Sequence, residues 1–421
     1  GKSKQADKVE IEWLDGYKQV LRNVACNQTL ALDHANASTS TLFDIKPKPA
    51  PVFEKPADNL KVDFVQTEND YDDFLREYTL PHKMSCLGNG IAVNDVNNDG
   101  LDDVFIGAAM NQPSCILLQQ KDGSYNKSAF AKDNMQYEDG GALLADIDGD
   151  GDNDLIVTTG GNELKENDKN YAVRLYTNDG KGNFKRNETA LPGSNTISSS
   201  CVVAADYDKD GDLDIFIGGR QVPGKYLQPT SSFIYRNDKG KFTNVSNEVA
   251  PVLKDIGMVT SALWSDFNND NAIDLVITGD WMPVTFLKNN NGKFDDVTHA
   301  TGLEKNTGWW QSIASADVDS DGDMDYICGN FGTNKRFKST VSVKDGTPLP
   351  LEGYLYDFDK SGTQDFIMGY YQNDVLYPVK SRERLIEQIP AIAKRIKTWD
   401  EFGKASLQDI FGSDLDKAIH K

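Results

Sequence analysis

The chain has few of the residues on which zinc binding, nucleic-acid binding and membrane insertion depend. Only four of its 421 residues are His, and its five Cys form no Cys-x-x-Cys pair, which argues against a zinc framework. Lys and Arg number 44 against 65 Asp and Glu, so the formal charge is −21 and a nucleic-acid partner is not expected. No apolar run approaches the ~18 residues of a membrane helix.

The sequence also lacks the common signatures of catalysis. It contains no GxSxG, HExxH or GxxxxGK[ST] motif, and its four His stand in unrelated contexts. Pairs of Asp could imitate the carboxylates of a glycosidase, but a repeated pattern assigns them to another role. We therefore expect a protein that is not an enzyme, with a calcium-assisted lyase or hydrolase as the alternative.

Acidic residues are abundant and recur in one pattern. Six segments each contain a short apolar run, an Asp-rich loop and a second apolar run ending near Gly, as in GALLADIDGDGDNDLIVTTGG from Gly141. The loops begin at Asp95, Asp146, Asp206, Asp266, Asp317 and Asp357, about 40 to 60 residues apart. Between them, stretches such as VRLYTNDGKGNF (residues 173–184) combine apolar residues with an Asn-Asp-Gly turn, which is typical of a β-hairpin.

Each unit therefore predicts four strands, two around the Asp-rich loop and two around the hairpin turn. Four short strands that recur at this interval are typical of a propeller blade. No amphipathic helix is expected between residues 90 and 375, which argues against an α/β fold. The predicted fold is an all-β propeller of about six or seven four-stranded blades over residues 61–380.

The flanks of the repeat region follow other patterns. Residues 1–45 carry a strand-like stretch and are predicted to be a separate segment. Residues 46–60 hold four prolines in KPKPAPVFEKPAD, which predicts an extended linker. Residues 381–421 show apolar residues at helical spacing, and TWDE at 398–401 fits a capping box, so a helical segment is expected there.

The Asp-rich loops offer oxygen ligands at alternate positions. Their pattern, D-x-[DN]-x-D-G-x-x-D or a near variant, supplies side chains at positions 1, 3, 5 and 9 and a backbone carbonyl at position 7. Calcium takes six to eight hard oxygens at about 2.3–2.6 Å, whereas magnesium resists near-complete protein coordination. An EF-hand is excluded because a strand, not a helix with Glu at position 12, follows each loop.

We therefore expect about six Ca²⁺ sites, the alternative being solvated turns without metal. The predicted ligands are Asp95, Asn97, Asp99, Leu101 and Asp103; Asp146, Asp148, Asp150, Asp152 and Asp154; Asp206, Asp208, Asp210, Asp212 and Asp214; Asp266, Asn268, Asp270, Ala272 and Asp274; Asp317, Asp319, Asp321, Asp323 and Asp325; and Asp357, Asp359, Ser361, Thr363 and Asp365. Asn and Ser make the first, fourth and sixth loops weaker, and Asn271 replaces the expected Gly but tolerates a positive φ.

With this pattern the chain resembles the FG-GAP/VCBS repeat family over about residues 60–380. FIGAA (105–109) and FIGGR (216–220) stand where the family motif stands. The resemblance implies a propeller with calcium loops like those of integrin α-subunits. In addition, IEWLDGYKQVLRNVACNQTLAL (11–32) is similar to the end of an ASPIC/UnbV segment.

A group of large bacterial surface proteins, often from Bacteroidetes, pairs these two segments, and the chain is similar to that group. The resemblance implies a piece of a longer protein outside the cytoplasm, at the cell surface or outer membrane. Members of the group are often lipoproteins associated with SusC/SusD-type nutrient uptake, which would be the partner complex.

We expect the function to be binding of a glycan or a protein, with a purely structural scaffold as another possibility. The candidate ligand-binding residues are Arg220, Trp281, Trp309 and Trp310, since aromatic rings stack on sugar faces. The alternative for the tryptophans is that they fill apolar space between blades. Because the longer connections follow the second strand of each unit, the ligand is expected at the end opposite the Asp-rich loops.

Overall fold

The computed structural model describes residues 4–13, 17–39, 62, 64–130, 135–193, 197–332 and 337–421. The chain divides into two compact units, Gly1–Asn59 and Leu60–Lys421. The first unit holds an antiparallel sheet of β1 (Gln5–Glu12), β2 (Tyr17–Ala25) and β3 (Ser38–Thr39). The Pro-rich linker predicted for residues 46–60 lies outside the described residues.

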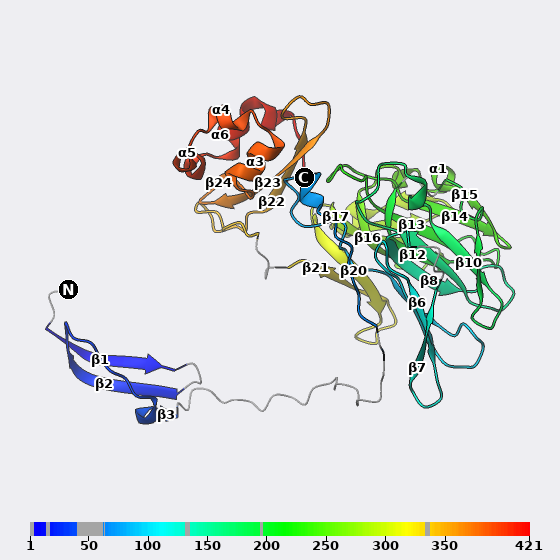
Figure 1. Ribbon diagram of the computed structural model, residues 1–421, viewed down its shortest axis with the longest axis horizontal. Helices are drawn as coiled ribbons and strands as arrows, with labels where there is room; N and C mark the ends of the chain where they lie inside the picture. The colour runs from blue at the N-terminus through cyan, green and yellow to red at the C-terminus, as the bar shows by residue number, and fades with distance from the viewer. Residues whose placement is uncertain are drawn as a thin grey trace. The chain divides into compact units, whose positions relative to one another are not determined.

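Four successive sets of four antiparallel strands form most of the second unit (Figure 1). Three sets are separate four-stranded sheets, and the fourth shares a six-stranded sheet with β20 (Gly308–Ala316) and β21 (Asp325–Asn330), because β17 also pairs with β20. Their strands are β4 (Ile91–Asn94), β5 (Asp103–Ile106), β6 (Cys115–Gln119) and β7 (Tyr125–Ala129); β8 (Asp139–Ala145), β9 (Asp154–Thr159), β10 (Arg174–Asn178) and β11 (Phe184–Asn187); β12 (Ser198–Ala205), β13 (Asp214–Gln221), β14 (Phe233–Asp238) and β15 (Lys241–Asn244); and β16 (Met258–Ser265), β17 (Asp274–Met282), β18 (Thr285–Asn289) and β19 (Phe294–Asp296). Each strand pairs with the next in the chain, as the repeats predict.

The first strands of successive repeats adjoin in chain order: β4 lies beside β8, β8 beside β12, and β12 beside β16. β16 in turn lies beside β20 (Gly308–Ala316), the first strand of the fifth repeat. Inner strands that adjoin while each sheet extends outward give a β-propeller-like fold. The prediction of an all-β protein built from four-stranded sheets is therefore confirmed.

The fifth and sixth repeats depart from the uniform blades that the sequence predicts. In the described residues the fifth repeat forms only two strands, β20 and β21 (Asp325–Asn330). The sixth forms β22 (Leu351–Tyr356), β23 (Asp365–Gln372) and β24 (Val375–Pro378), and a strand near the end of the chain, β25 (Ile419–His420), completes the sheet beside β22.

The predicted C-terminal helical segment is present. It comprises α3 (Arg382–Gln388), α4 (Ile392–Arg395), α5 (Trp399–Lys404) and α6 (Leu407–Phe411). Pro390 lies between α3 and α4, and Thr398 and Glu401 form the predicted capping box of α5. Apolar side chains of this segment, including Leu385 and Ile392, are buried against the sixth sheet.

Short helices occur elsewhere in the chain. Two single turns, α1 (Ser246–Val249) and α2 (Thr298–Thr301), follow the fourth strands of the third and fourth sheets. The 3₁₀ turns include η1 (His34–Asn36), η2 (Asp73–Leu75), η4 (Lys169–Tyr171), η6 (Pro251–Leu253) and η7 (Gly412–Lys417). None of these elements forms the crossover helix of an α/β fold.

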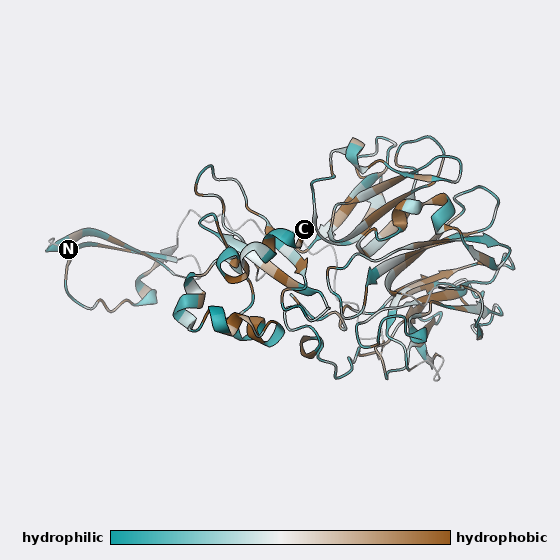
Figure 2. Cartoon of the chain, turned by 90° about the horizontal axis from the view of Figure 1, so that it is seen from above, coloured by the Kyte–Doolittle hydropathy of each residue, from teal (hydrophilic) through white to brown (hydrophobic). Residues whose placement is uncertain are grey.

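Hydrophobic residues gather in the strands of the sheets, whereas most loops are hydrophilic (Figure 2). Every residue of β9, β13 and β17 is buried, because each strand has a partner on both edges and a neighbouring sheet on each face. The core between the second and third sheets joins Ile156 and Leu175 to Val202 and Ile215. This burial explains why the second strands are continuous apolar runs in the sequence.

An asparagine at the end of the third strand ties each sheet to the one before it. The side-chain amides of Asn178, Asn237 and Asn289 donate across the sheet boundary at 2.7–2.8 Å. Their acceptors are the backbone carbonyls of Val96, Ile147 and Tyr207, the second residue of the preceding Asp-rich loop. The same amides donate to their own sheet's loop, so one side chain connects two loops.

We predict that Asn237→Ala destabilises the chain by about 1–3 kcal/mol, because two buried carbonyls lose their donor. Thermal melting at fixed metal concentration measures the loss. The matched control is Asn290→Ala, which removes an exposed amide bonded only to Asp295 and should change the melting temperature little. Equal effects of the two substitutions would contradict a special role for the buried amide.

Candidate metal centres

In every Asp-rich loop, the carboxylate of the first Asp holds the turn closed. It accepts the backbone N–H of the residue at position 6 at 2.7–3.2 Å. The side chain at position 5 accepts the N–H of position 7 at 2.9–3.3 Å. The predicted ligands at positions 1, 5 and 7 therefore share one curled turn in each of the six repeats.

Two residues of each loop have a positive φ. Position 6 is Gly in five loops, and Asn271 takes the same conformation at φ 65° in the fourth, as predicted. Position 4 is also left-handed, at φ values of 56–80°. The sequence does not predict the positive φ at position 4. Lys and Ser rarely adopt a positive φ, and they occupy this position as Lys209, Ser320 and Lys360.

The Asp at position 9 joins the loop to the sheet. Its Oδ2 accepts the N–H of position 2 at 2.9–3.4 Å in all six loops. In the four complete sheets, Oδ1 accepts a backbone N–H from the end of the third strand at 2.7–2.8 Å. The closing residues Asp103, Asp154, Asp214, Asp274 and Asp365 are almost fully buried. In the fifth loop, Asp325 is exposed.

Burial makes these carboxylates costly to ionise. It raises the pKa of Asp154 and of Asp274 to about 6 and that of Asp214 to about 7, and neighbouring carboxylates raise each pKa further. Desolvation, assisted by the adjacent Asp150, also raises the pKa of Asp148. A loop that holds several carboxyl groups with raised pKa values needs a positive charge nearby if all of these groups are to be ionised at neutral pH.

In four loops, three carboxylates converge so that one oxygen from each lies within 4.8 Å of the others. The groups are Asp146, Asp148 and Asp150; Asp206, Asp208 and Asp210; Asp317, Asp319 and Asp325; and Asp357, Asp359 and Asp365. Oδ1 of Asp148 is buried and has no hydrogen-bond partner among the described residues. An unpaired carboxylate oxygen in a cluster of acids fits a divalent cation.

The first and fourth loops, which contain Asn, form no such triplet among the described residues. In the fourth loop the amide of Asn268 donates to Asp274 at 2.9 Å, and Lys288 lies 3.0 Å from Asp270. Lys288 neutralises the charge of Asp270, and the Asn268 amide satisfies one oxygen of Asp274 that a cation could otherwise use. The loop is therefore less suited to a cation than its sequence pattern alone indicates.

The candidate ligand-binding residues lie at the other end of the sheets, and three of them are buried. Arg220 is 3% exposed and forms an ion pair with Asp280 at 2.5 Å. Trp281 donates its indole N–H to Tyr226, and Trp309 belongs to the same apolar cluster. Trp310 is half-buried and donates to the carbonyl of Asn306. Trp309 and Trp310 both lie within β20.

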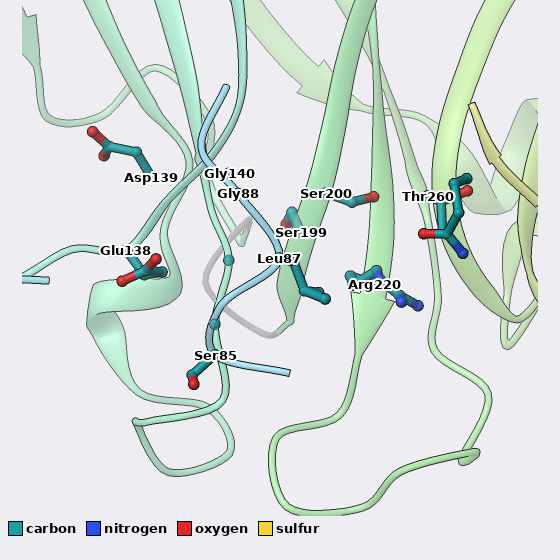
Figure 3. Close-up of a pocket in the computed structure, with 13 residues that line it drawn as sticks. Ser85, Leu87, Gly88, Glu138, Asp139, Gly140, Ser199, Ser200, Arg220 and Thr260 are labelled. Atoms are coloured by element: carbon teal, nitrogen blue, oxygen red, sulfur yellow. The ribbon is translucent and has the colours of Figure 1, made fainter. Parts of the chain in front are cut away.

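A cavity of about 140 Å³ lies where the first strands begin, opposite their Asp-rich loops (Figure 3). Arg220 lines it together with Ser199, Thr260 and Glu138. Nη1 of Arg220 and Oγ of Ser199 are buried without a partner among the described residues. Burial raises the pKa of Glu138 to about 8. Neither Glu138 nor Ser199 belongs to a sequence motif, so sequence reasoning missed both residues.

Trp281 and Trp309 line a second hollow, of about 340 Å³. Glu352 and His420 of the sixth sheet line its other side. The structure therefore separates the four candidate ligand-binding residues: Arg220 belongs to the first cavity, the two buried tryptophans to the second, and Trp310 to neither.

The fold and the loops together define a repeat protein with acidic loops on a β-propeller-like scaffold. The model of the FG-GAP-like repeat matches residues 95–157, 146–217 and 266–328, and the ASPIC and UnbV model matches residues 1–39. The chain thus carries FG-GAP-like repeats associated with an ASPIC and UnbV segment, and the resemblance read from its sequence is confirmed. The sixth loop lies outside these matches.

The chain is similar to cartilage acidic protein 1 of Mus musculus, with 23% identity over 351 residues that cover 72% of this chain and 51% of that protein. It is 26% identical to mouse integrin alpha-8 over 171 residues, which cover 34% and 15% of the two chains. The chain thus spans about half the length of the first of these relatives and a smaller part of the second.

Among solved structures, the exotype rhamnogalacturonan lyase YesX matches with a TM-score of 0.30 and 16% identity, covering 69% of this chain and 63% of that chain. The V. cholerae biofilm matrix protein Bap1 matches with a TM-score of 0.27 and 14% identity, covering 69% and 38%. In the part of this chain that the structure describes, no helix is long and apolar enough to cross a membrane.

We predict that, without metal, the chain melts a few degrees higher at pH 5.5 than at pH 8. The closing residues Asp154, Asp214 and Asp274 have pKa values of about 6 to 7 in the fold, above the ~3.9 of an unfolded chain. As the pH falls through 7, the folded state therefore binds protons that the unfolded state does not, and the free energy of unfolding rises.

Calorimetry in chelator at constant ionic strength measures this effect. In the Asp214→Asn variant, the rise in melting temperature from pH 8 to pH 5.5 should be smaller, because one titrating group is lost. Asp238→Asn, at an exposed position, is the control and should keep the full gain. A gain that Asp214→Asn leaves unchanged would mean that overall charge, not the buried carboxylates, sets the pH dependence.

Proposed function

We propose that the chain is a calcium-stabilised binding module that works outside the cytoplasm and has no catalytic activity. The observation that carries the proposal is the set of acidic loops, in which one hydrogen-bonded frame recurs six times and carboxylates converge in four copies. Calcium suits loops that offer five protein oxygens each, whereas magnesium would keep most of its water. Similarity to cartilage acidic protein 1 and integrin alpha-8 supports a place outside the cell.

Calcium is expected to raise the melting temperature strongly. A site held at about 100 times its Kd contributes ~2.7 kcal/mol, and several sites add to one another. Melting in chelator, in millimolar calcium and in millimolar magnesium measures the effect, with elemental analysis to count bound ions. An unchanged melting temperature together with no bound calcium would contradict the proposal.

A matched pair of variants tests whether the gain comes from the loops. Asp150→Ala removes one acid of a converging triplet, whereas Ser361→Ala removes a neutral oxygen from the sixth loop. Both residues stand at position 5. The calcium-induced gain should fall more for Asp150→Ala. Equal losses would show that the number of carboxylates does not grade the sites.

We further propose that the first cavity is the ligand site, which deepens the expectation that the ligand binds opposite the Asp-rich loops. Its support is the pair of buried, unpartnered polar atoms, Oγ of Ser199 and Nη1 of Arg220. A buried donor without a partner costs about 1–3 kcal/mol, which a polar ligand would recover. The hydroxyls of a terminal sugar or the polar side chain of a protein loop have this chemistry. A cell-surface site, in an outer-membrane uptake complex of the SusC/SusD type, is part of the proposal.

Ser199→Ala tests the cavity without disturbing the fold, since the hydroxyl has no partner to lose. A glycan array and a pull-down from the native cell envelope identify the ligand. The variant should then bind it about tenfold more weakly, with unchanged calcium-dependent melting. Ser200→Ala is the neighbouring control: its hydroxyl lines the same cavity but is already bonded to the carbonyl of Val259. If binding survives Ser199→Ala, the cavity is not the site.

A second candidate function is polysaccharide cleavage, and it rests on Glu138. With a pKa raised by burial to about 8, this carboxyl can hold a proton at neutral pH, as a general acid does. Incubation with acidic and neutral polysaccharides, followed by chromatography of the products, distinguishes the two functions. Cleavage that disappears in Glu138→Gln would replace the binding proposal with an enzyme.

A further inference from the structure

Among the described residues, the fourth Asp-rich loop is the only one in which a predicted metal ligand forms an ion pair. Nζ of Lys288 lies 3.0 Å from Oδ2 of Asp270, the side chain at position 5. Lys288 stands one residue before the end of β18, and the equivalent residue of the second sheet is the uncharged Thr177. In the third sheet, Arg236 holds this place but pairs with Asp238, outside the loop. The fourth loop thus has a cationic side chain on one of its own ligands.

A second lysine reaches the same loop from the loop before it. Lys209 stands at position 4 of the third loop, and its Nζ donates to the backbone carbonyl of Asn271 at 2.5 Å. The side chain at position 4 of the first loop crosses in the same way, since Asn98 donates to Asp152 of the second loop at 2.7 Å. The crossing group is neutral between the first two loops, whereas between the third and fourth it carries a positive charge.

The first loop provides a matched comparison for the fourth. Both loops have Asn at position 3 and Asp at positions 1, 5 and 9. Among the described residues, no acid of the first loop forms an ion pair, so its three carboxylates have no basic partner. The three carboxylates of the fourth loop share two ammonium groups. Attraction for a divalent cation follows the unbalanced negative charge, and this charge is therefore smaller in the fourth loop than in the first.

The fourth loop nevertheless keeps the frame of a cation site. Asp266 accepts the backbone N–H of Asn271 at 2.7 Å, as the first Asp does in the other loops. Oδ1 of Asn268 is buried and has no partner among the described residues. The FG-GAP-like repeat model also matches this loop, within residues 266–328. Oxygen ligands are therefore available, and the difference from the other loops lies in the charge.

We propose that the fourth loop binds no divalent cation, because Lys288 and Lys209 neutralise it from neighbouring elements. The assignment rests on the proposed calcium binding of the other loops, since it states which loop takes no ion. An ammonium group beside Asp270 repels a dication and occupies a carboxylate that the dication would need. The fourth loop would then stay neutralised when calcium is scarce, unlike loops whose acids depend on an ion.

Native mass spectrometry of the full chain in calcium counts the bound ions. The unmodified chain should bind at most one ion for each of the other five loops. The double variant Lys209→Met and Lys288→Met should bind one ion more, because Met keeps the length of the side chain without its charge. Adding Asp270→Asn should remove the gained ion. Lys185→Met, which changes an exposed lysine with no ion pair among the described residues, is the control and should leave the count unaltered.

Two results of the count would overturn the proposal. One is a sixth ion on the unmodified chain. The other is a count that the two lysine changes leave unaltered, because the lysines would then not be what keeps an ion out of the loop.

Melting in chelator at pH 8 separates this proposal from the proposed function. Without metal, Lys288→Met should lower the melting temperature by about 2 °C, because Asp270 loses its counter-ion, whereas Lys185→Met should not. A chain that binds no calcium in any loop would contradict the proposed function, and the melting comparison would then decide whether Lys288 neutralises the fourth loop. Equal melting temperatures of the two variants would overturn that role.

Discussion

The structure depends on a buried carboxylate in five of the six repeats, the Asp that closes the acidic loop. In the first four repeats this Asp accepts the N–H that begins the loop with one oxygen and an N–H from the third strand with the other, as Asp214 does with Tyr207 and Asn237. Two segments that are distant in sequence are thereby fixed to the start of a central strand. A neutral side chain of the same size could not accept both bonds, since an amide has only one acceptor oxygen.

Burying an ionised carboxylate costs free energy, and this cost links folding to the binding of cations. Burial raises the pKa of closing residues such as Asp214, and the other acids of the loop raise it further, so ionising all of these carboxyl groups is unfavourable without a cation. Backbone N–H groups nevertheless hold the side chains at positions 1 and 5 of the loop in place. The protein part of the site is therefore preorganised, which reduces the ordering that a cation would have to bring about.

The sequence was sufficient to predict the repeats, the strands around each loop, the hairpin turns and the C-terminal helices. These features rest on short-range patterns of apolar residues, Gly and Asp. It could not reveal the position-4 conformation, because Lys209 and Ser320 do not favour it. Nor could it show that Asn237 crosses to the preceding loop, since that contact joins residues 90 positions apart. Burial of Trp281 and Arg220 depends likewise on neighbours that only the fold brings together.

The two ends of the sheets differ in how their polar groups are satisfied, and this difference favours different ligands. At the loop end, backbone N–H groups and carboxylates converge in small turns, which suits a single ion. At the other end, ion pairs such as Arg220 with Asp280 neutralise the buried charges and leave isolated donors facing a cavity. A neutral polar molecule can use those donors without separating the ion pairs. If both proposed sites are occupied, stability and recognition would reside at opposite ends, and ions would stiffen the sheets without occupying the proposed ligand site.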